Sequence, residues 1–271
     1  MENSAFFRFF TKIHKLFFAS LFFTIPLAVF TGAFVLIGLL TGFNNVMLWL
    51  LSIIPAYPFY SGFVMVIRKY AVEKVDCNVT EVILNTLRTE WKKSLINGFA
   101  FYIVMICSIF ATMYYGSMML VNKNFISIFT VYMIFSLALI TVMFYVPLIT
   151  VTYELRLRDI YKNSFILLAG KLWRSLCALI LVAVASFAFY MFMDFSGGAY
   201  SIFTFVITAL LYPLVYTYIN ISVISKGVQE SVGSFVAEAE DEAEDDISIV
   251  ADSDSDYIFV NGKMVKNPNK N

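Results

Sequence analysis

The chain has 271 residues, of which 60% are hydrophobic, 18% aromatic and 14% charged, with a formal net charge of zero at pH 7. A mean hydropathy of +0.80 excludes an ordinary soluble domain. We therefore expect an integral membrane protein that is surrounded by lipids and has no nucleic acid partner.

Six uncharged runs are long enough to cross the membrane, because about 20 helical residues span a hydrocarbon layer roughly 30 Å thick. The runs are continuous and do not alternate polar with apolar residues, which indicates helices rather than barrel strands. The first run is too long for the core of a signal peptide, so we interpret it as a retained anchor. The predicted spans cover about residues 16–40, 46–67, 95–121, 125–153, 175–193 and 199–225.

Basic residues lie almost entirely on one side of these spans. Fifteen of them precede span one, lie in the links between spans two and three and between four and five, or directly follow span six at Lys226, whereas Lys123 is alone on the other side. Basic residues concentrate in cytoplasmic loops. We therefore predict that both termini are cytoplasmic.

A similar phrase precedes two of the spans, "TEWKKSLING" at residues 89–98 and "GKLWRSLCAL" at residues 170–179. Apolar residues at helical spacing come before each phrase and also before span one, which predicts three amphipathic helices in the cytoplasmic interface. The fold class is then all-α, with six spans forming three helical hairpins. A docking site for a soluble partner is the alternative to membrane anchoring. The expected interfacial anchors are Trp91, Lys92, Lys93, Trp173 and Arg174.

Each returning span contains proline, which deprives a backbone carbonyl of its partner and kinks the helix. A simple packing kink is one interpretation. The other is a polar path between kinked spans, built from hydroxyls, amides and free carbonyls. The candidate residues that line a cavity or kink a helix are Pro55, Pro58, Pro147, Pro213, Asn97 and Asn220.

Catalytic chemistry has little support in the sequence. His14 is the single histidine, the spans contain no ionisable Asp, Glu, Lys, Arg or His, and no phosphate-binding glycine loop occurs. Glu154 and Asp194 lie at opposite membrane edges and cannot act as a carboxylate pair. We predict no enzymatic activity, no cofactor and no metal site.

The segment 227–271 forms an acidic tail, since eleven of the nineteen acidic residues lie between Glu230 and Asp256. We expect most of it to be disordered, because it has little apolar surface to bury. The stretch "YIFVNGKMVK", residues 257–266, alternates around Asn261 and Gly262 and predicts a short hairpin. The tail is either without a role or a tethered docking element for a cytoplasmic protein.

Four stretches in this order resemble the YesL-like family of bacterial multi-pass membrane proteins. They are "FFRFFTKIHKLFFASLFFTIPL", "PAYPFYSGFVMVIRKYAVEK", "EWKKSL" and "VPLITVTYELRLRDIYKNSFILLAGKLWRSL", and the likeness covers roughly residues 5–226. The resemblance implies the plasma membrane of a Gram-positive bacterium and an association with carbohydrate uptake or utilisation. It carries over no catalytic or binding residue.

Two functional hypotheses follow from the sequence. The first is a non-catalytic accessory or scaffold protein beside components of a sugar uptake transporter. The second is a small-solute transporter that uses a cavity between the proline-kinked helices.

Overall fold

The structure is a computed structural model that describes residues 5–43, 45–195, 201–251, 257–260 and 263–266, with side chains for 13–43, 45–195 and 201–231. The chain forms two compact units, Met1–Ser225 and Lys226–Asn271. Each unit is described by itself below.

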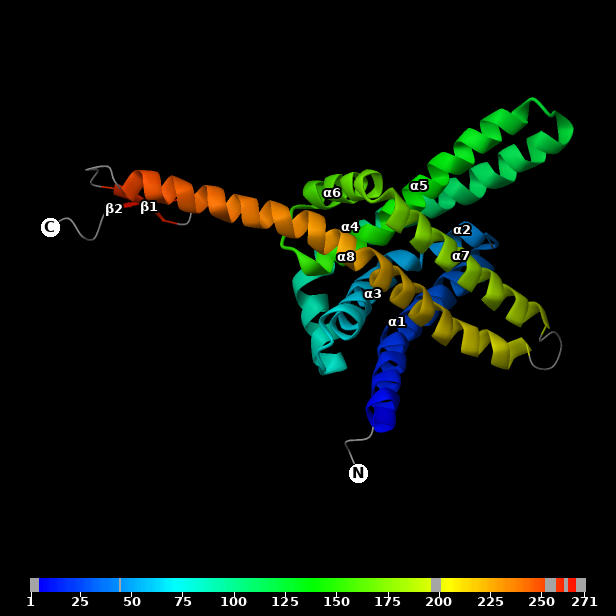
Figure 1. Cartoon of the computed structure of the whole chain (residues 1–271). Coiled ribbons are helices and arrows are strands. Elements are labelled where there is room, and N and C mark those ends of the chain that lie inside the picture. The colour runs from blue at the N-terminus through cyan, green and yellow to red at the C-terminus, as the bar shows by residue number, and fades with distance from the viewer. Residues whose placement is uncertain (1–4, 44, 196–200, 252–256, 261–262, 267–271) are drawn as a thin grey trace. The chain divides into compact units, whose positions relative to one another are not determined.

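Eight α-helices and one π-helical turn make up the described part before the tail strands (Figure 1). Six helical stretches within the described residues are long and apolar enough to cross a membrane, which confirms an all-α multi-pass fold. They fall on α1, on α2 with α3 and η1, and on α4, α5, α7 and α8. The bounds are α1 Ala5–Thr41, α2 Val46–Leu50, α3 Ile53–Arg68, η1 Lys69–Glu73, α4 Val79–Val121, α5 Phe125–Thr152, α6 Leu157–Gly170, α7 Leu172–Phe195 and α8 Ser201–Ala251.

Span two is a broken helix. Asn45 caps α2 by accepting a hydrogen bond from the Met47 backbone N–H at 3.1 Å. The helix is interrupted at Leu51 and Ser52, and Pro55 lies in the first turn of α3, where its missing N–H has no intrahelical partner to lose. The span ends in the π-helical turn η1, after which Lys74 adopts a left-handed conformation with φ 56°.

Helix α3 is the centre of the membrane unit. The span that contains α3 has 56% of its most apolar 18-residue stretch buried, whereas the other five spans have 6% to 17% of theirs buried. Small residues let α4 approach it closely: a Cβ atom built on Gly98 would lie 2.7 Å from Cβ of Tyr57, and one on Gly62 would lie 3.0 Å from Cγ2 of Ile83. Such contacts are typical of helix packing in membranes, where small residues allow backbones to meet.

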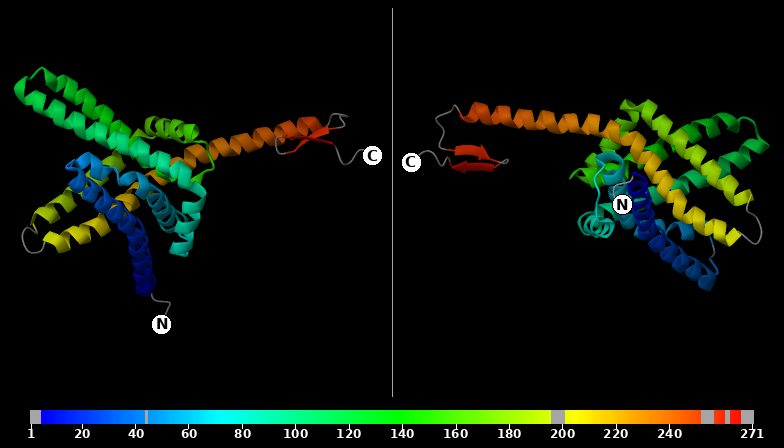
Figure 2. Two further views of the ribbon diagram at one scale, coloured as in Figure 1. Left: turned by 180° about the vertical axis from the view of Figure 1, so that it is seen from behind. Right: turned by 60° about the horizontal axis from the view of Figure 1, so that its bottom comes forward.

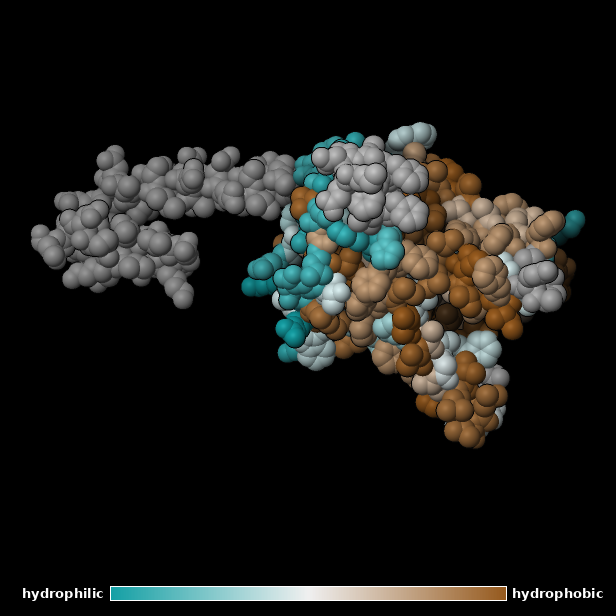
Figure 3. All heavy atoms as spheres, turned by 90° about the horizontal axis from the view of Figure 1, so that it is seen from below, coloured by the Kyte–Doolittle hydropathy of each residue, from teal (hydrophilic) through white to brown (hydrophobic). Residues whose placement is uncertain are grey.

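The hairpins diverge away from α3. Figures 1 and 2 show the α4–α5 pair and the α7–α8 pair pointing apart at their turns, while their other ends meet near α3. Side chains at these turns are the most exposed of the spans, including Val121 at 85% and Phe195 at 95%. Figure 3 shows that hydrophobic residues cover most of one face of this unit, with hydrophilic residues gathered at one end. These apolar surfaces fit contact with lipid.

The expected interfacial helices are only partly separate elements. Helix α4 runs without interruption through Val121, and α1 is also continuous, so in both cases a single helix replaces the predicted helix and span. No proline or glycine interrupts the junction before span three, so nothing stops the helix. Helix α6 is distinct, because the backbone leaves helical geometry at Lys171 (φ −124°, ψ 41°) after Gly170.

The described residues of the tail unit form the end of a helix and two strands. Helix α8 continues through Ala251, although residues 252–256 lie outside the described part. Alanine and glutamate, which are frequent in this segment, are strong helix formers, and this preference competes with the lack of apolar surface. Strands β1 (Tyr257–Val260) and β2 (Lys263–Lys266) pair antiparallel in the segment of the predicted hairpin, with Tyr257 opposite Lys266. The predicted turn residues, Asn261 and Gly262, lie outside the described residues.

The contact at Gly98 gives a first testable prediction. Substitution Gly98→Ala should lower the free energy of unfolding by about 1–3 kcal/mol, because the new methyl group must displace Tyr57 or the helix backbone. Gly32→Ala is the matched control, since nothing lies within 4 Å of its added Cβ atom. Thermal unfolding of both variants in the same detergent would measure the difference, and equal stability would contradict the packing described.

Candidate functional site

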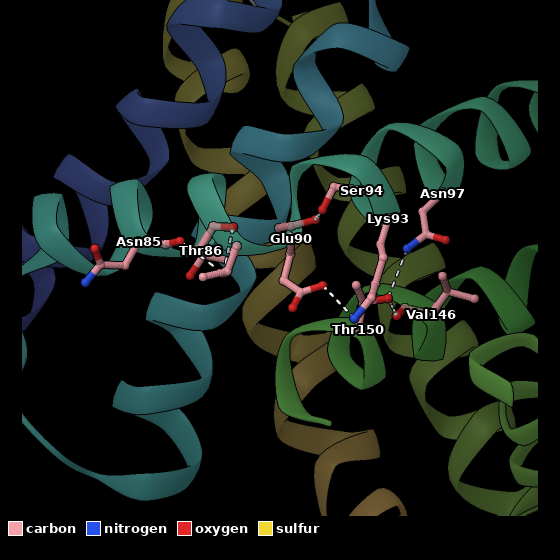
Figure 4. A network of polar contacts seen from close by, with 10 residues as sticks. Asn85, Thr86, Glu90, Lys93, Ser94, Asn97, Val146 and Thr150 are labelled. Carbon is pink, nitrogen blue, oxygen red and sulfur yellow. Dashed lines mark hydrogen bonds and ion pairs between the residues drawn. The ribbon is translucent and has the colours of Figure 1, made fainter. Parts of the chain in front are cut away.

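A buried polar cluster joins α4, α5 and α6, and Figure 4 shows its Asn97 and Thr150 side chains pointing toward each other. Asn97 on α4 is fully buried, and its Nδ2 atom donates a hydrogen bond to Oγ1 of Thr150 on α5 at 2.9 Å. The Tyr161 hydroxyl on α6 donates to Oδ1 of Asn97, also at 2.9 Å. Burial raises the pKa of Tyr161 to about 12, so the donor stays protonated at physiological pH. Both the nitrogen and the oxygen of the Asn97 amide thus form hydrogen bonds that join helices.

Other buried hydroxyls join helices in the same way. Ser94 on α4 donates to Ser61 on α3 at 2.8 Å, and the hydroxyls of Tyr145 on α5 and Ser175 on α7 share a hydrogen bond of 2.7 Å. Polar side chains in spans commonly serve as such contacts. The geometry therefore favours a packing role for these groups over a polar path.

Two prolines leave backbone carbonyls that neighbouring helices approach. Pro213 deprives the Ala209 carbonyl of its helical partner, and Oγ1 of Thr24 on α1 donates to that oxygen at 3.3 Å. Pro58 frees the Ile54 carbonyl, whose oxygen lies 3.1 Å from the Cβ position built on Gly98. Pro147 is buried within α5. Pro26, which we did not predict as a kink, lies inside α1.

A cavity of about 480 Å³ lies between the six spans. Its size is within the range of small-molecule sites. Of the six candidate residues, its wall includes Pro213, whereas Asn97 belongs to the polar cluster. Asn220 is buried on α8 outside the wall, and its Oδ1 atom has no hydrogen-bond partner among the described residues. The wall residues are Phe23, Leu27, Ile53, Tyr57, Tyr60, Phe101, Met105, Ile140, Met143, Phe144, Leu179, Val182, Ala183, Tyr212, Pro213 and Tyr216.

Four tyrosines supply the polar atoms of this wall, and we did not predict them. Tyr57 and Tyr60 are three residues apart on α3, and Tyr212 and Tyr216 are four apart on α8, so each pair lies on one helix face. Both pairs lie close to a proline in a returning span. That combination was the signal in the sequence that could have located the site.

A second hollow, of about 590 Å³, lies near the start of span one. Lys15 and Asp76 face each other there, with Nζ of Lys15 at 2.6 Å from Oδ1 of Asp76. The Tyr70 hydroxyl donates to the same carboxylate at 2.8 Å. Hydrogen bonds from Lys15 and Tyr70 hold the pKa of Asp76 below its usual value. Because these charges are already paired, we interpret this hollow as a contact between α1 and the segment after η1. His14 also lines it.

The expected anchors lie at or near the surface. Trp91 is 47% exposed and Trp173 is 76% exposed. Nζ of Lys92 lies 5.7 Å from the centroid of the Trp91 ring, and Lys93 pairs with Glu90 at 3.0 Å. Arg174 is close enough to Tyr145 to act on it electrostatically. The exposed indoles fit placement at the headgroups, which stays a prediction.

No protein-family model, curated protein or solved structure matches this chain. Among the described residues, no three His, Cys, Asp or Glu side chains are grouped so that they could hold a metal ion. The tyrosine-lined cavity is therefore the candidate site that the geometry itself defines.

The contact between Thr24 and the carbonyl freed by Pro213 can be tested with a double-mutant cycle. Thr24→Val should lower the free energy of unfolding by about 0.5–1 kcal/mol in the natural chain, since it removes one interhelical hydrogen bond. In a Pro213→Ala background the new backbone N–H can bond to Ala209, so the same substitution should cost almost nothing.

Thr130→Val is the control for this cycle, because Thr130 is exposed and bonds to Ile126 of its own helix. Unfolding in mixed micelles would measure all four stabilities. An equal loss from Thr24→Val in both backgrounds would show that the hydrogen bond is independent of the proline.

Proposed function

We propose that the chain is a non-catalytic accessory protein of a bacterial plasma membrane that acts by binding. The observation that carries this proposal is the cavity wall. All six spans contribute to it, yet the described residues of the wall are apolar side chains and tyrosines, with no carboxylate, amine or imidazole among them. General acid-base catalysis at neutral pH needs a group that titrates in that range.

The place of action is proposed from the resemblance to the YesL-like family. It suggests a Gram-positive bacterium and partners among the components of a sugar uptake transporter. The surface that such a partner would meet is the basic side, with Trp91 and Trp173 exposed on it. The tail hairpin is a second place for a cytoplasmic protein to dock.

The proposed orientation puts both termini in the cytoplasm, because fifteen basic residues flank one side of the spans. A reporter fused after Asp194 should therefore report a position outside the cytoplasm. Fusions after Lys74, Arg158 or Lys226 should report a cytoplasmic position. A cytoplasmic signal from the fusion at Asp194 would contradict this orientation.

Small-solute transport is the second candidate, and the cavity is the observation that favours it. A site enclosed by all six spans is where a carrier would hold its solute. Against it, the described spans use the buried amide of Asn97 and several hydroxyls for packing, which leaves Oδ1 of Asn220 as the buried amide oxygen without a partner among the described residues. The polar groups left to coordinate an ion are therefore few.

Affinity purification from native membranes distinguishes the two candidates. We expect the full-length chain to recover components of a sugar uptake system. A truncation after Lys226 serves as the matched variant, because it removes the tail unit and keeps the spans. Partners lost on truncation would assign the docking to the tail, and partners retained would assign it to the bundle. A chain that purifies alone and carries solute into liposomes would contradict the accessory role.

A further inference from the structure

Two tyrosines of the cavity wall have hydroxyl groups that make no hydrogen bond with a described residue. Tyr57 is 4% exposed, and its hydroxyl makes no hydrogen bond with any described residue. Tyr216 is half-buried, and its hydroxyl likewise makes no hydrogen bond with a described residue. By contrast, Tyr60 accepts a hydrogen bond from Thr217 at 3.4 Å, and Tyr212 shares one with Ser186 at 3.0 Å. Neither hydroxyl oxygen is among the fully buried, unpartnered atoms of the described residues, so both stay accessible. A ligand in the cavity can therefore supply the partner that a tyrosine hydroxyl in an apolar site normally has.

Aromatic rings line this cavity in two series of tilted and edge-to-face contacts. One series of rings runs across α1, α3 and α4, with Phe23 and Tyr60 at 5.2 Å, Tyr60 and Tyr57 at 5.5 Å, and Tyr57 and Phe101 at 6.0 Å. The other series joins α5 and α8 through Phe144, Tyr216 and Tyr212, at 5.8 Å and 6.0 Å. Rings at these separations offer faces and edges for another flat group to pack against.

The composition of the wall decides which chemical class fits. A free sugar carries many hydroxyl groups, and each one buried without a partner weakens binding by about tenfold. The wall offers four tyrosine hydroxyls, of which Tyr212 shares a hydrogen bond with Ser186 and Tyr60 accepts one from Thr217, so few are left for a solute with many hydroxyl groups. A charged solute would find no opposite charge among the wall residues. The wall therefore disfavours free sugars and charged solutes.

We propose that the cavity binds a neutral, lipid-soluble molecule with a flat apolar body and one or two oxygen atoms that accept hydrogen bonds from Tyr57 and Tyr216. This inference rests on the proposed function in one respect, namely that the bundle acts by binding. It makes the ligand of the bundle a membrane-dissolved compound and not the sugar itself.

Photolabelling with benzophenone tests this inference, because benzophenone is neutral, has two aromatic rings and one ketone oxygen, and reacts with nearby C–H bonds under ultraviolet light. Full-length protein in lipid nanodiscs is labelled, digested and mapped by mass spectrometry. We expect saturable labelling of the wall, which includes Met105 and Met143. Tyr57→Phe and Tyr216→Phe should each weaken labelling about fivefold, the effect of one lost hydrogen bond.

Tyr190→Phe is the matched control, since Tyr190 on α7 is 64% exposed and lies outside the wall. A benzophenone that carries a glucose unit should label the wall poorly. Labelling that spreads over the exposed spans and is unchanged in both wall variants would overturn the proposal, and so would equal labelling by the glucoside.

The outcome is separable from that of the accessory role. If uptake components co-purify but benzophenone does not label the wall, the ligand class is wrong and the accessory role stands. If the wall is labelled as expected but no partner is recovered, the accessory role fails and the binding site stands.

Discussion

The membrane unit depends on the close approach of α3 and α4 at Gly98. Because lipid offers no hydrophobic advantage to one apolar surface over another, helices in a bilayer associate through tight packing and hydrogen bonds. Gly98 allows the backbone of α4 to lie against Tyr57, and the neighbouring Asn97 and Ser94 then reach hydrogen-bond partners on α5 and α3. A bulkier residue at this point would separate the polar groups as well as the backbones.

The same constraint explains how the helix interruptions are tolerated. An unsatisfied carbonyl in hydrocarbon is costly, so a proline is accepted where another helix can approach the oxygen it frees. Thr24 on α1 donates a hydrogen bond to the Ala209 carbonyl, and this contact joins α1 to α8, which are far apart in the sequence. The polar side chains of the spans thus serve mainly to complete the backbone and to join helices.

The cavity follows from this arrangement, in which the polar side chains join helices and aromatic side chains line the space between them. The hairpins meet near α3 and diverge beyond it, and the aromatic side chains that line the space between them do not fill it. Tyrosine suits such a wall, because its ring is apolar while its hydroxyl can bond to a ligand. A wall of this kind favours recognition of a few oxygen atoms on an apolar molecule over the transfer of ions or sugars.

The sequence by itself determined the fold class, the number of spans and their approximate limits. Runs without charge and the length of a helix that crosses a bilayer are local properties, so they can be predicted without knowledge of contacts. The hairpin of the tail was also local, since alternation and an Asn-Gly pair indicate it directly.

The tertiary structure decided which polar residues are engaged and which face a cavity. Asn97 and Pro213 were equal candidates in the sequence, yet one lies in a packing cluster and the other in the cavity wall. The role of Tyr57 could not be predicted, because it depends on α1, α4, α5, α7 and α8 meeting α3 at particular rotations. Those rotations are set by contacts between residues far apart in the chain, such as Thr24 with Ala209, which no local pattern records.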